Sequence, residues 1–208
     1  MQKTPDEIVA QAREIARAEA QAVKGLVKQL DTCIIEVLNL LLTCPGHVLV
    51  TGAGTSHAVA QRFAHLLSCS GTPSLCIDAA DALHGGAGAI TPNDVVYIIS
   101  KGGHSDEVNQ FARIAKSRGA IVIAQTENVD SPLAQMSDEI FRIVSPSKVD
   151  PYGMVATGSS LVNSAAGAVL CALLLDLRGY TRAAFAATHP GGAVGEKIKH
   201  NQAIENAS

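Results

Sequence analysis

The chain has 208 residues, a length that suits one substantial domain with a buried core. Hydrophobic residues make up 47% of it and charged residues only 17%, which excludes a disordered chain and favours a deeply buried α/β core. The net charge of −3 gives no support for nucleic-acid binding, which requires a basic surface.

The first part of the chain, residues 4–44, is expected to form a helical lead-in. Thr4-Pro5-Asp6-Glu7 has the pattern of a helix start, with a capping threonine, proline at the first helical position and a glutamate that completes a capping box. Apolar residues then recur every three or four positions as far as Leu30, as in an amphipathic helix. Asp31 is expected to cap a second helix that runs to Leu42.

Strands and helices alternate through the remaining core, residues 47–198. Apolar runs predict strands at 48–50, 74–77, 95–99, 120–124 and 140–144. Helical periodicity and caps predict helices at 57–67, 105–117 and 132–136, and an apolar helix that begins near Ser160. Because these strands lack a polar face, the predicted fold is a three-layer α/β sandwich, a parallel sheet with helices on both faces, in a single domain spanning residues 1–208.

Two glycine turns with hydroxyl side chains follow strands of this core. The first lies in HVLVTGAGTS, which ends at Ser56, and the second is SKGGHS, from Ser100 to Ser105. A tight turn that opens a helix leaves backbone N–H groups free beside the positive end of the helix dipole, which suits a phosphate. Thr55, Ser56, Ser100 and Ser105 could add hydroxyl donors, although a serine before a helix is often only a cap.

The first turn also resembles two other motifs in part. Its Gly52-Ala53-Gly54 start is that of a dinucleotide fingerprint, with Asp78 near the distance of a ribose-binding acid, but His57 stands where the third glycine belongs. Ser56 lies in a near match to a nucleophile elbow, with Ala58 in place of the final glycine. Both matches are incomplete, so we favour phosphate capture.

Longer stretches of the sequence resemble the SIS (sugar isomerase) domain family, most closely the isomerase domain of arabinose 5-phosphate isomerases. The resemblance is carried by VTGAGTSHA (50–58), GTPSLCIDAADALHGGAG (71–88), VVYIISKGGHSDEV (95–108), SPLA (131–134), ATGSSLVN (156–163) and RGYTRAAFAATHPGGAVG (178–195). It implies a five-stranded parallel sheet, an aldose–ketose isomerisation of a sugar phosphate through an enediol, and sites shared between subunits. The relatives usually carry a pair of CBS domains downstream, which this chain is expected to lack.

The resemblance also implies roles for individual residues. Glu107 matches the catalytic carboxylate, His189 the acid/base or ring-opening histidine, and His84 a further histidine of the site. Read without the resemblance, Glu107 is equally a helix-start acid and His84 a loop residue. The predicted substrate-binding residues are Gly54, Thr55, Ser56, Ser100, Lys101, Gly102, Gly103 and Ser105.

The sequence departs from the family pattern at four positions, one of which is Gly86, where arabinose 5-phosphate isomerases tend to carry Asp. Thr55 stands where the family has a lysine, and we hypothesise that Lys101 supplies the missing charge. Gly102 replaces a serine of the second turn. The later family glutamate falls near Val149, with Asp150 beside it as a shifted substitute. These changes leave open a non-catalytic sugar-phosphate-binding protein, or an isomerase of a hexulose or amino-sugar phosphate.

The remaining expectations concern location and partners. The five cysteines, an odd number without a Cys-x-x-Cys pair, are expected to be reduced core residues of a cytoplasmic protein. The polar N-terminus shows no secretory signal, and the apolar stretch 165–175 is too short to span a bilayer, so it is a buried helix or a subunit interface. We expect a phosphorylated sugar as ligand, no metal or cofactor, no nucleic acid or membrane, and a homo-oligomer, dimer or tetramer.

Overall fold

A computed structural model describes residues 3–205 of the chain, with side chains described as far as residue 198. Five strands form one sheet in the order β2-β1-β3-β4-β5, and every neighbouring pair is parallel. The strands are β1 Val48–Gly52, β2 Ser74–Cys76, β3 Val95–Ile99, β4 Ile121–Thr126 and β5 Glu139–Arg142. The predicted parallel sheet is confirmed.

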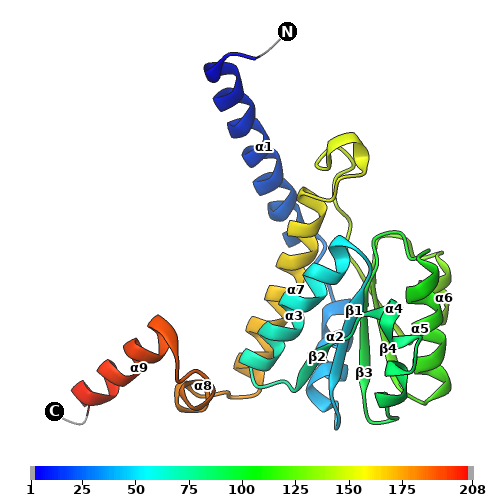
Figure 1. Cartoon of the computed structure of the whole chain (residues 1–208), viewed down its shortest axis with the longest axis vertical. Helices are drawn as coiled ribbons and strands as arrows, with labels where there is room; N and C mark the ends of the chain where they lie inside the picture. Colours follow the sequence, from blue (N-terminus) through cyan, green and yellow to red (C-terminus); the bar gives the residue numbers. More distant parts are fainter. Residues whose placement is uncertain (1–2, 206–208) are drawn as a thin grey trace.

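Helices cover both faces of this sheet (Figure 1). The α-helices are α1 Pro5–Gly25, α2 Cys33–Thr43, α3 Thr55–Cys69, α4 Ala79–Ala82, α5 Asp106–Ser117, α6 Pro132–Met136, α7 Gly158–Leu177, α8 Arg182–Thr188 and α9 Gly192–Glu205. Three short 3₁₀ helices are η1 Leu26–Lys28, η2 Gly86–Ala89 and η3 Pro151–Gly153.

Strand β3 shows why the predicted three layers form. Tyr97 and Ile99 belong to the core that packs against α2, α3 and α7, whereas Val96 and Ile98 belong to the core against α4, α5 and α6. All five residues of β3 are buried. Because successive side chains of a strand point to opposite faces, a strand that is apolar throughout requires helices on both sides.

The helical lead-in begins as predicted. The Thr4 side chain accepts a hydrogen bond from the Glu7 backbone N–H, and the Glu7 carboxylate accepts one from the Thr4 N–H, which completes the capping box. Asp31 accepts a hydrogen bond from the Cys33 N–H at the start of α2. The C-terminal end of helix α1 lies against α7, and the N-terminal end of α1 projects beyond the sheet (Figure 1).

Several predicted boundaries were wrong. Helix α3 begins at Thr55, two residues before the predicted start, because Gly54 supplies the turn. Strand β5 ends at Arg142 instead of residue 144. Helices α4, α8 and α9 were not predicted, although Asp78 caps α4 and Thr181 caps α8 through side-chain hydrogen bonds to backbone N–H groups.

Helix α7 is longer than the apolar stretch noted in the sequence. It has 20 residues with a mean hydropathy of 1.8, so by length and composition alone it could cross a membrane. One stripe of it packs in the core, where Gly167 lies against the ring of Phe63 and Leu170 and Leu174 are fully buried. Core helices of globular proteins share this length and composition, so α7 carries no membrane assignment.

Candidate active site

The site is organised by the carboxyl ends of two neighbouring strands. Gly52 at the end of β1 pairs with Ile99 at the end of β3. Helix α3 then packs on one face of the sheet and α5 on the other. This divergence is the topological switch point at which doubly wound sheets bind ligands. The two predicted phosphate turns therefore lie side by side, as expected.

The turn between β1 and α3 depends on two glycines. A Cβ atom on Gly52 would lie 2.8 Å from the Ile99 carbonyl oxygen, so only glycine lets the turn approach β3 this closely. Gly54 has a φ of +56° and precedes α3 without a side-chain cap. The hydroxyl groups of Thr55 and Ser56 have no hydrogen-bond partner within the described residues, so neither serves as a cap.

The turn between β3 and α5 has the same character. Ser100 is buried, and its backbone N–H donates to the Gln125 carbonyl. Ser105 is the N-cap residue of α5, yet its side chain makes no capping hydrogen bond. The hydroxyls of Ser100 and Ser105 also lack partners in the described part of the chain. The reading of these hydroxyl residues as simple helix caps is therefore wrong, and their donors are free for a ligand.

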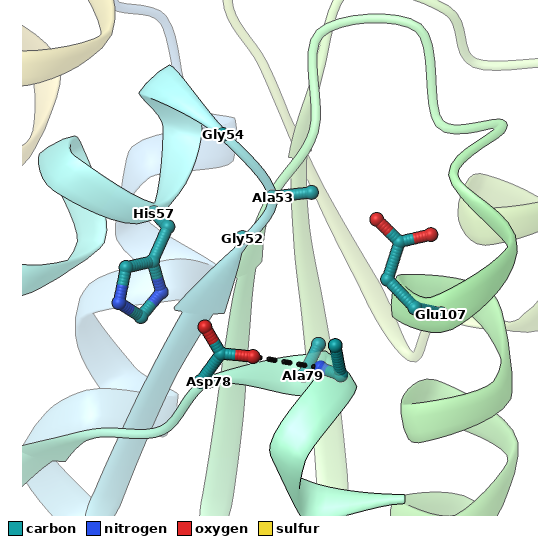
Figure 2. A pocket seen from close by; sticks show the side chains of 8 residues that line it. Gly52, Ala53, Gly54, His57, Asp78, Ala79 and Glu107 are labelled. Atoms are coloured by element: carbon teal, nitrogen blue, oxygen red, sulfur yellow. Dashed lines mark hydrogen bonds between the residues drawn. The ribbon is translucent and has the colours of Figure 1, made fainter.

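A cavity of about 280 Å³ opens beside the first turn, and Glu107 lines it (Figure 2). Glu107 is half-buried in the first turn of α5, and its carboxylate has no hydrogen bond or ion pair within the described residues. Figure 2 shows the carboxylate facing Ala53 across the cavity, with His57 and Asp78 on the other side of the β1 turn. An unpaired carboxylate in a cavity beside a predicted anion-binding turn is a candidate general base.

His57 and Asp78 also line this cavity, although neither is predicted as a residue of the phosphate site. The Asp78 carboxylate accepts hydrogen bonds from the Ala80 and Asp81 N–H groups and so caps α4. His57 lies in the first turn of α3, with Nδ1 4.0 Å from the Cys76 sulfur. The signal for both is their position just after β1 and β2, but only the strand order shows that these two strands are neighbours.

A second, smaller cavity of about 40 Å³ lies between the N-terminal ends of α3 and α7. Thr55, Ser56 and Lys101 line it together with residues of α7, among them Ser159. The Ser159 hydroxyl is buried without a hydrogen-bond partner. Two predicted binding residues of the first turn and one of the second therefore meet here.

The Lys101 ammonium group is held by carboxylates. It lies 3.0 Å from Asp150 Oδ2 and 4.0 Å from Glu127 Oε1. The other oxygen of Asp150 accepts a hydrogen bond from the Ser159 N–H. Burial opposes ionisation of Asp150, but the hydrogen bonds from Ser159 and Lys101 outweigh it and lower the pKa of this carboxyl.

The two other predicted catalytic residues lie outside the Glu107 cavity. His84 is exposed in the loop after α4, where its backbone N–H donates to the Asp81 carbonyl. His189 follows α8, and its Nε2 lies 3.4 Å from the sulfur of Cys69, the last residue of α3. At 1.5 Å per residue, the length of α3 separates Cys69 from Thr55 by about 21 Å. Within one chain, His189 therefore does not reach the cavity that Glu107 lines.

Comparison of the sequence with known proteins gives a consistent result. Residues 41–181 match the model of the SIS domain. Arabinose 5-phosphate isomerase KpsF of Escherichia coli is 33% identical over 192 residues, which cover 92% of this chain and 59% of KpsF. Arabinose 5-phosphate isomerase KdsD of Pseudomonas aeruginosa is 34% identical over 180 residues, which cover 86% of this chain and 55% of KdsD. The chain thus spans less than two thirds of the length of these relatives.

Solved structures agree with the fold. A protein of Escherichia coli CFT073 in complex with A5P superposes with a TM-score of 0.87 at 27% identity, over 90% of this chain and 100% of that chain. A protein of Listeria monocytogenes gives a TM-score of 0.88 at 28% identity, over 91% of this chain and 100% of that chain.

Proposed function

Because the chain belongs to the SIS domain family, we propose that it is a phosphosugar isomerase that interconverts an aldose phosphate and a ketose phosphate, with arabinose 5-phosphate as the first substrate to test. The observation that carries the proposal is the unpaired carboxylate of Glu107 in a cavity beside two turns with unengaged hydroxyls. The names of the curated relatives and the A5P bound to a structural relative support the choice of substrate.

In the proposed mechanism the two turns bind the phosphoryl group. Backbone N–H groups at the start of α3 and the hydroxyls of Thr55, Ser56, Ser100 and Ser105 would donate hydrogen bonds to its oxygens. Gly54, Gly102 and Gly103 would keep the backbone close enough to the anion. Fixing the phosphoryl end presents the carbonyl end of the open-chain sugar to Glu107.

Glu107 would then transfer the proton between carbons. Its carboxylate takes the proton from C2 of the aldose, an acid protonates O1, and the product is an enediol. Removal of the O2 proton and return of the carbon-bound proton to C1 give the ketose, so protons and electrons balance within the substrate. A histidine suits the transfer between the oxygens because it titrates near neutrality.

Two histidines are candidates for this proton transfer between the oxygens, one from the same chain and one from a second subunit. His57 lines the Glu107 cavity of the same chain. We propose that His189, and His84 with it, act in the site of a second subunit, because His189 is separated from the first turn by the length of α3. This arrangement makes the functional form a homo-oligomer, a dimer or a tetramer, which we expect in the cytoplasm.

A binding protein without turnover is the second candidate. It is favoured by Thr55 at the position of the family lysine and by the carboxylates that hold the charge of Lys101. Under this alternative the same turns bind a sugar phosphate, and the protein serves as a sensor or an accessory subunit.

The variant Glu107→Gln separates the two candidates. For an enzyme, we expect kcat to fall by about 10²–10⁴-fold while the affinity for arabinose 5-phosphate stays within about threefold. The matched control is Asp106→Asn, which removes the neighbouring exposed carboxylate of the same helical turn and should leave kcat unchanged. A binder instead shows thermal stabilisation by the sugar phosphate and no isomerisation by the wild-type protein, and a panel of hexulose and amino-sugar phosphates identifies any other substrate.

A further inference from the structure

A nucleophile and a base meet at the far end of α3, away from the Glu107 cavity of the same chain. The sulfur of Cys69 lies 3.4 Å from Nε2 of His189 and 3.6 Å from Nε2 of His65. His65 and Cys69 are four residues apart on α3 and so share one face of the helix, while His189 comes from the junction after α8. Two imidazoles therefore face one thiol.

The surroundings of His189 decide which of its nitrogens carries the proton. Nδ1 lies 2.9 Å from the carbonyl oxygen of Phe185, which can only accept a hydrogen bond, and 3.1 Å from the Thr188 hydroxyl, which itself donates to that carbonyl. These contacts favour the proton on Nδ1. The ring also stacks on Phe185, with centroids 3.8 Å apart and planes at 15°. Nε2 is then an unprotonated acceptor held in place beside Cys69, and the thiol donates its S–H to it.

The other four thiols lack this arrangement. Burial raises the pKa of Cys33 to about 11 and that of Cys171 to about 12. Cys76 has one imidazole neighbour, with His57 Nδ1 4.0 Å from its sulfur, but burial and the negative charge of Asp78 raise the pKa of this thiol. The Cys44 thiol faces the Asn93 carbonyl oxygen at 3.6 Å, which cannot take a proton at neutral pH.

Space for a small reactant lies beside His189. Cys69 is half-buried and not enclosed in the core. His189 also lines a cavity of about 350 Å³ whose other walls are mostly apolar, with Ala183, Ala186, Pro190 and Ile198 among them. A small electrophile with an apolar body fits these walls better than a charged one.

We propose that Cys69 is a site of covalent modification by small α,β-unsaturated carbonyl compounds, with His189 as the base that activates the thiol. The sulfur attacks the β-carbon as its proton passes to Nε2 of His189, and the electrons of the C=C bond move onto the α-carbon and the carbonyl oxygen. The imidazolium then returns that proton to the α-carbon, so one S–C and one C–H bond replace the S–H bond and the C=C π bond. No other reactant is needed, and the inference does not depend on the proposed isomerase activity.

The test is site-resolved alkylation of the full chain with acrylamide at neutral pH, followed by peptide mass spectrometry. We expect Cys69 to react at least about tenfold faster than Cys44, a half-buried thiol whose printed polar contact is with a carbonyl oxygen and not with an imidazole. The variant His189→Asn can keep a hydrogen bond to the Phe185 carbonyl but has no base at Nε2. This variant should lower the alkylation rate of Cys69 at least about fivefold and leave the alkylation rate of Cys44 unchanged.

Two results would overturn the proposal: equal rates for Cys69 and Cys44 in the wild-type chain, or an unchanged Cys69 rate in His189→Asn. Buried Cys171 reports whether a variant is folded, because it reacts only when the core opens. If His189→Asn exposes Cys171, the wild-type comparison decides alone. In concentrated urea the five thiols should converge to similar rates, which shows that the folded site causes the difference.

Discussion

The ammonium group of Lys101 lies 3.0 Å from the buried carboxylate of Asp150, and this contact ties the turn after β3 to the segment before α7. The second oxygen of Asp150 accepts the Ser159 N–H at the start of α7. Lys101 and Asp150 are the residues that the sequence suggests as substitutes for a lysine and a glutamate of the family. The pair keeps a lysine ammonium beside the turn of Thr55 and Ser56, but with its charge largely balanced by a carboxylate.

Replacing Asp150 by asparagine should destabilise the fold. The amide can still accept the Ser159 N–H, but it leaves Lys101 without its nearest anion. We expect the free energy of unfolding in urea to fall by about 1–3 kcal/mol near neutral pH. The matched control is Asp138→Asn, which breaks a more exposed pair with Lys116 and should cost at most about 1 kcal/mol. Equal losses in the two variants would contradict the anchoring role of Asp150.

Stability should decrease on acidification because of two buried aspartates. Burial opposes ionisation of Asp94 and Asp150, but hydrogen bonds to the carboxylates more than compensate and lower the pKa of each. The donors to Asp94 are the His47 N–H and the N–H and hydroxyl of Thr91. A lowered pKa in the folded state contributes stability above the unfolded value of about 3.9, and this contribution is lost as the pH falls through the folded value.

The measurement is the free energy of unfolding in urea between pH 6 and pH 2, both limits chosen to bracket the ordinary range of aspartate at about 3.9. The wild-type curve should fall steeply below about pH 4, and Asp150→Asn should give a shallower fall because one of the two linked groups is gone. Parallel curves for the two proteins would mean that Asp150 does not titrate differently in the folded and unfolded states.

The sequence predicts best where an apolar run is buried throughout or a specific cap marks the start of a helix. Strand β3 and helix α6 have the predicted bounds, because an uninterrupted apolar run and a Ser-Pro helix start leave few alternatives. Strand β5 lies at the edge of the sheet and pairs only with β4. Its first residue, Glu139, is charged and belongs to the strand because it pairs with Ile123 of β4. A local hydrophobic pattern cannot predict such a pairing.

The site is predictable only as far as local motifs reach. The two turns could be found because glycines and hydroxyls follow apolar runs, and Glu107 follows the second turn directly. The place of Asp78 in the same cavity depends on β2 lying next to β1, an order that the sequence does not contain. The position of His189 depends on α8, whose alanine-rich sequence has no apolar periodicity.

A methyl group on Gly103 should disrupt the second turn. The residue has a φ of +67°, and an added Cβ would lie 2.1 Å from the Ser131 hydroxyl oxygen. That hydroxyl cannot move away freely, because it donates to the Asn128 carbonyl and accepts the Ala134 N–H at the start of α6. We expect Gly103→Ala to lower the free energy of unfolding by about 2 kcal/mol or more.

The neighbouring glycine gives the control for this prediction. At Gly102 the nearest atom to an added Cβ is His104 Cδ2 at 4.0 Å, and φ is not in the left-handed region. Gly102→Ala should therefore change stability by no more than about 0.5 kcal/mol. Chemical denaturation of both variants decides, and similar losses would mean that the turn adapts more easily than its contacts imply.

Subunit mixing tests whether the proposed active site is shared. Glu107→Gln and His189→Asn should each be nearly inactive alone. If Glu107 of one chain acts with His189 of another, a mixed dimer holds one site with both changes and one with neither. Random mixing of equal amounts should then restore activity at about a quarter of all sites, because half of the dimers are mixed and each has one intact site.

The cavity supplies the control for mixing. His57 and Glu107 line the same cavity of one chain, so Glu107→Gln mixed with His57→Asn would not gain activity if the site needs only these two residues of each chain. In that mixture His57 and Glu107 of each site would come from the same subunit, so every site would carry one of the two substitutions. Activity could then not exceed the average of the separate variants. Native mass spectrometry should first verify that mixed oligomers form. If activity then recovers when Glu107→Gln is mixed with His57→Asn but not when it is mixed with His189→Asn, the assignment of His189 to the shared site is wrong.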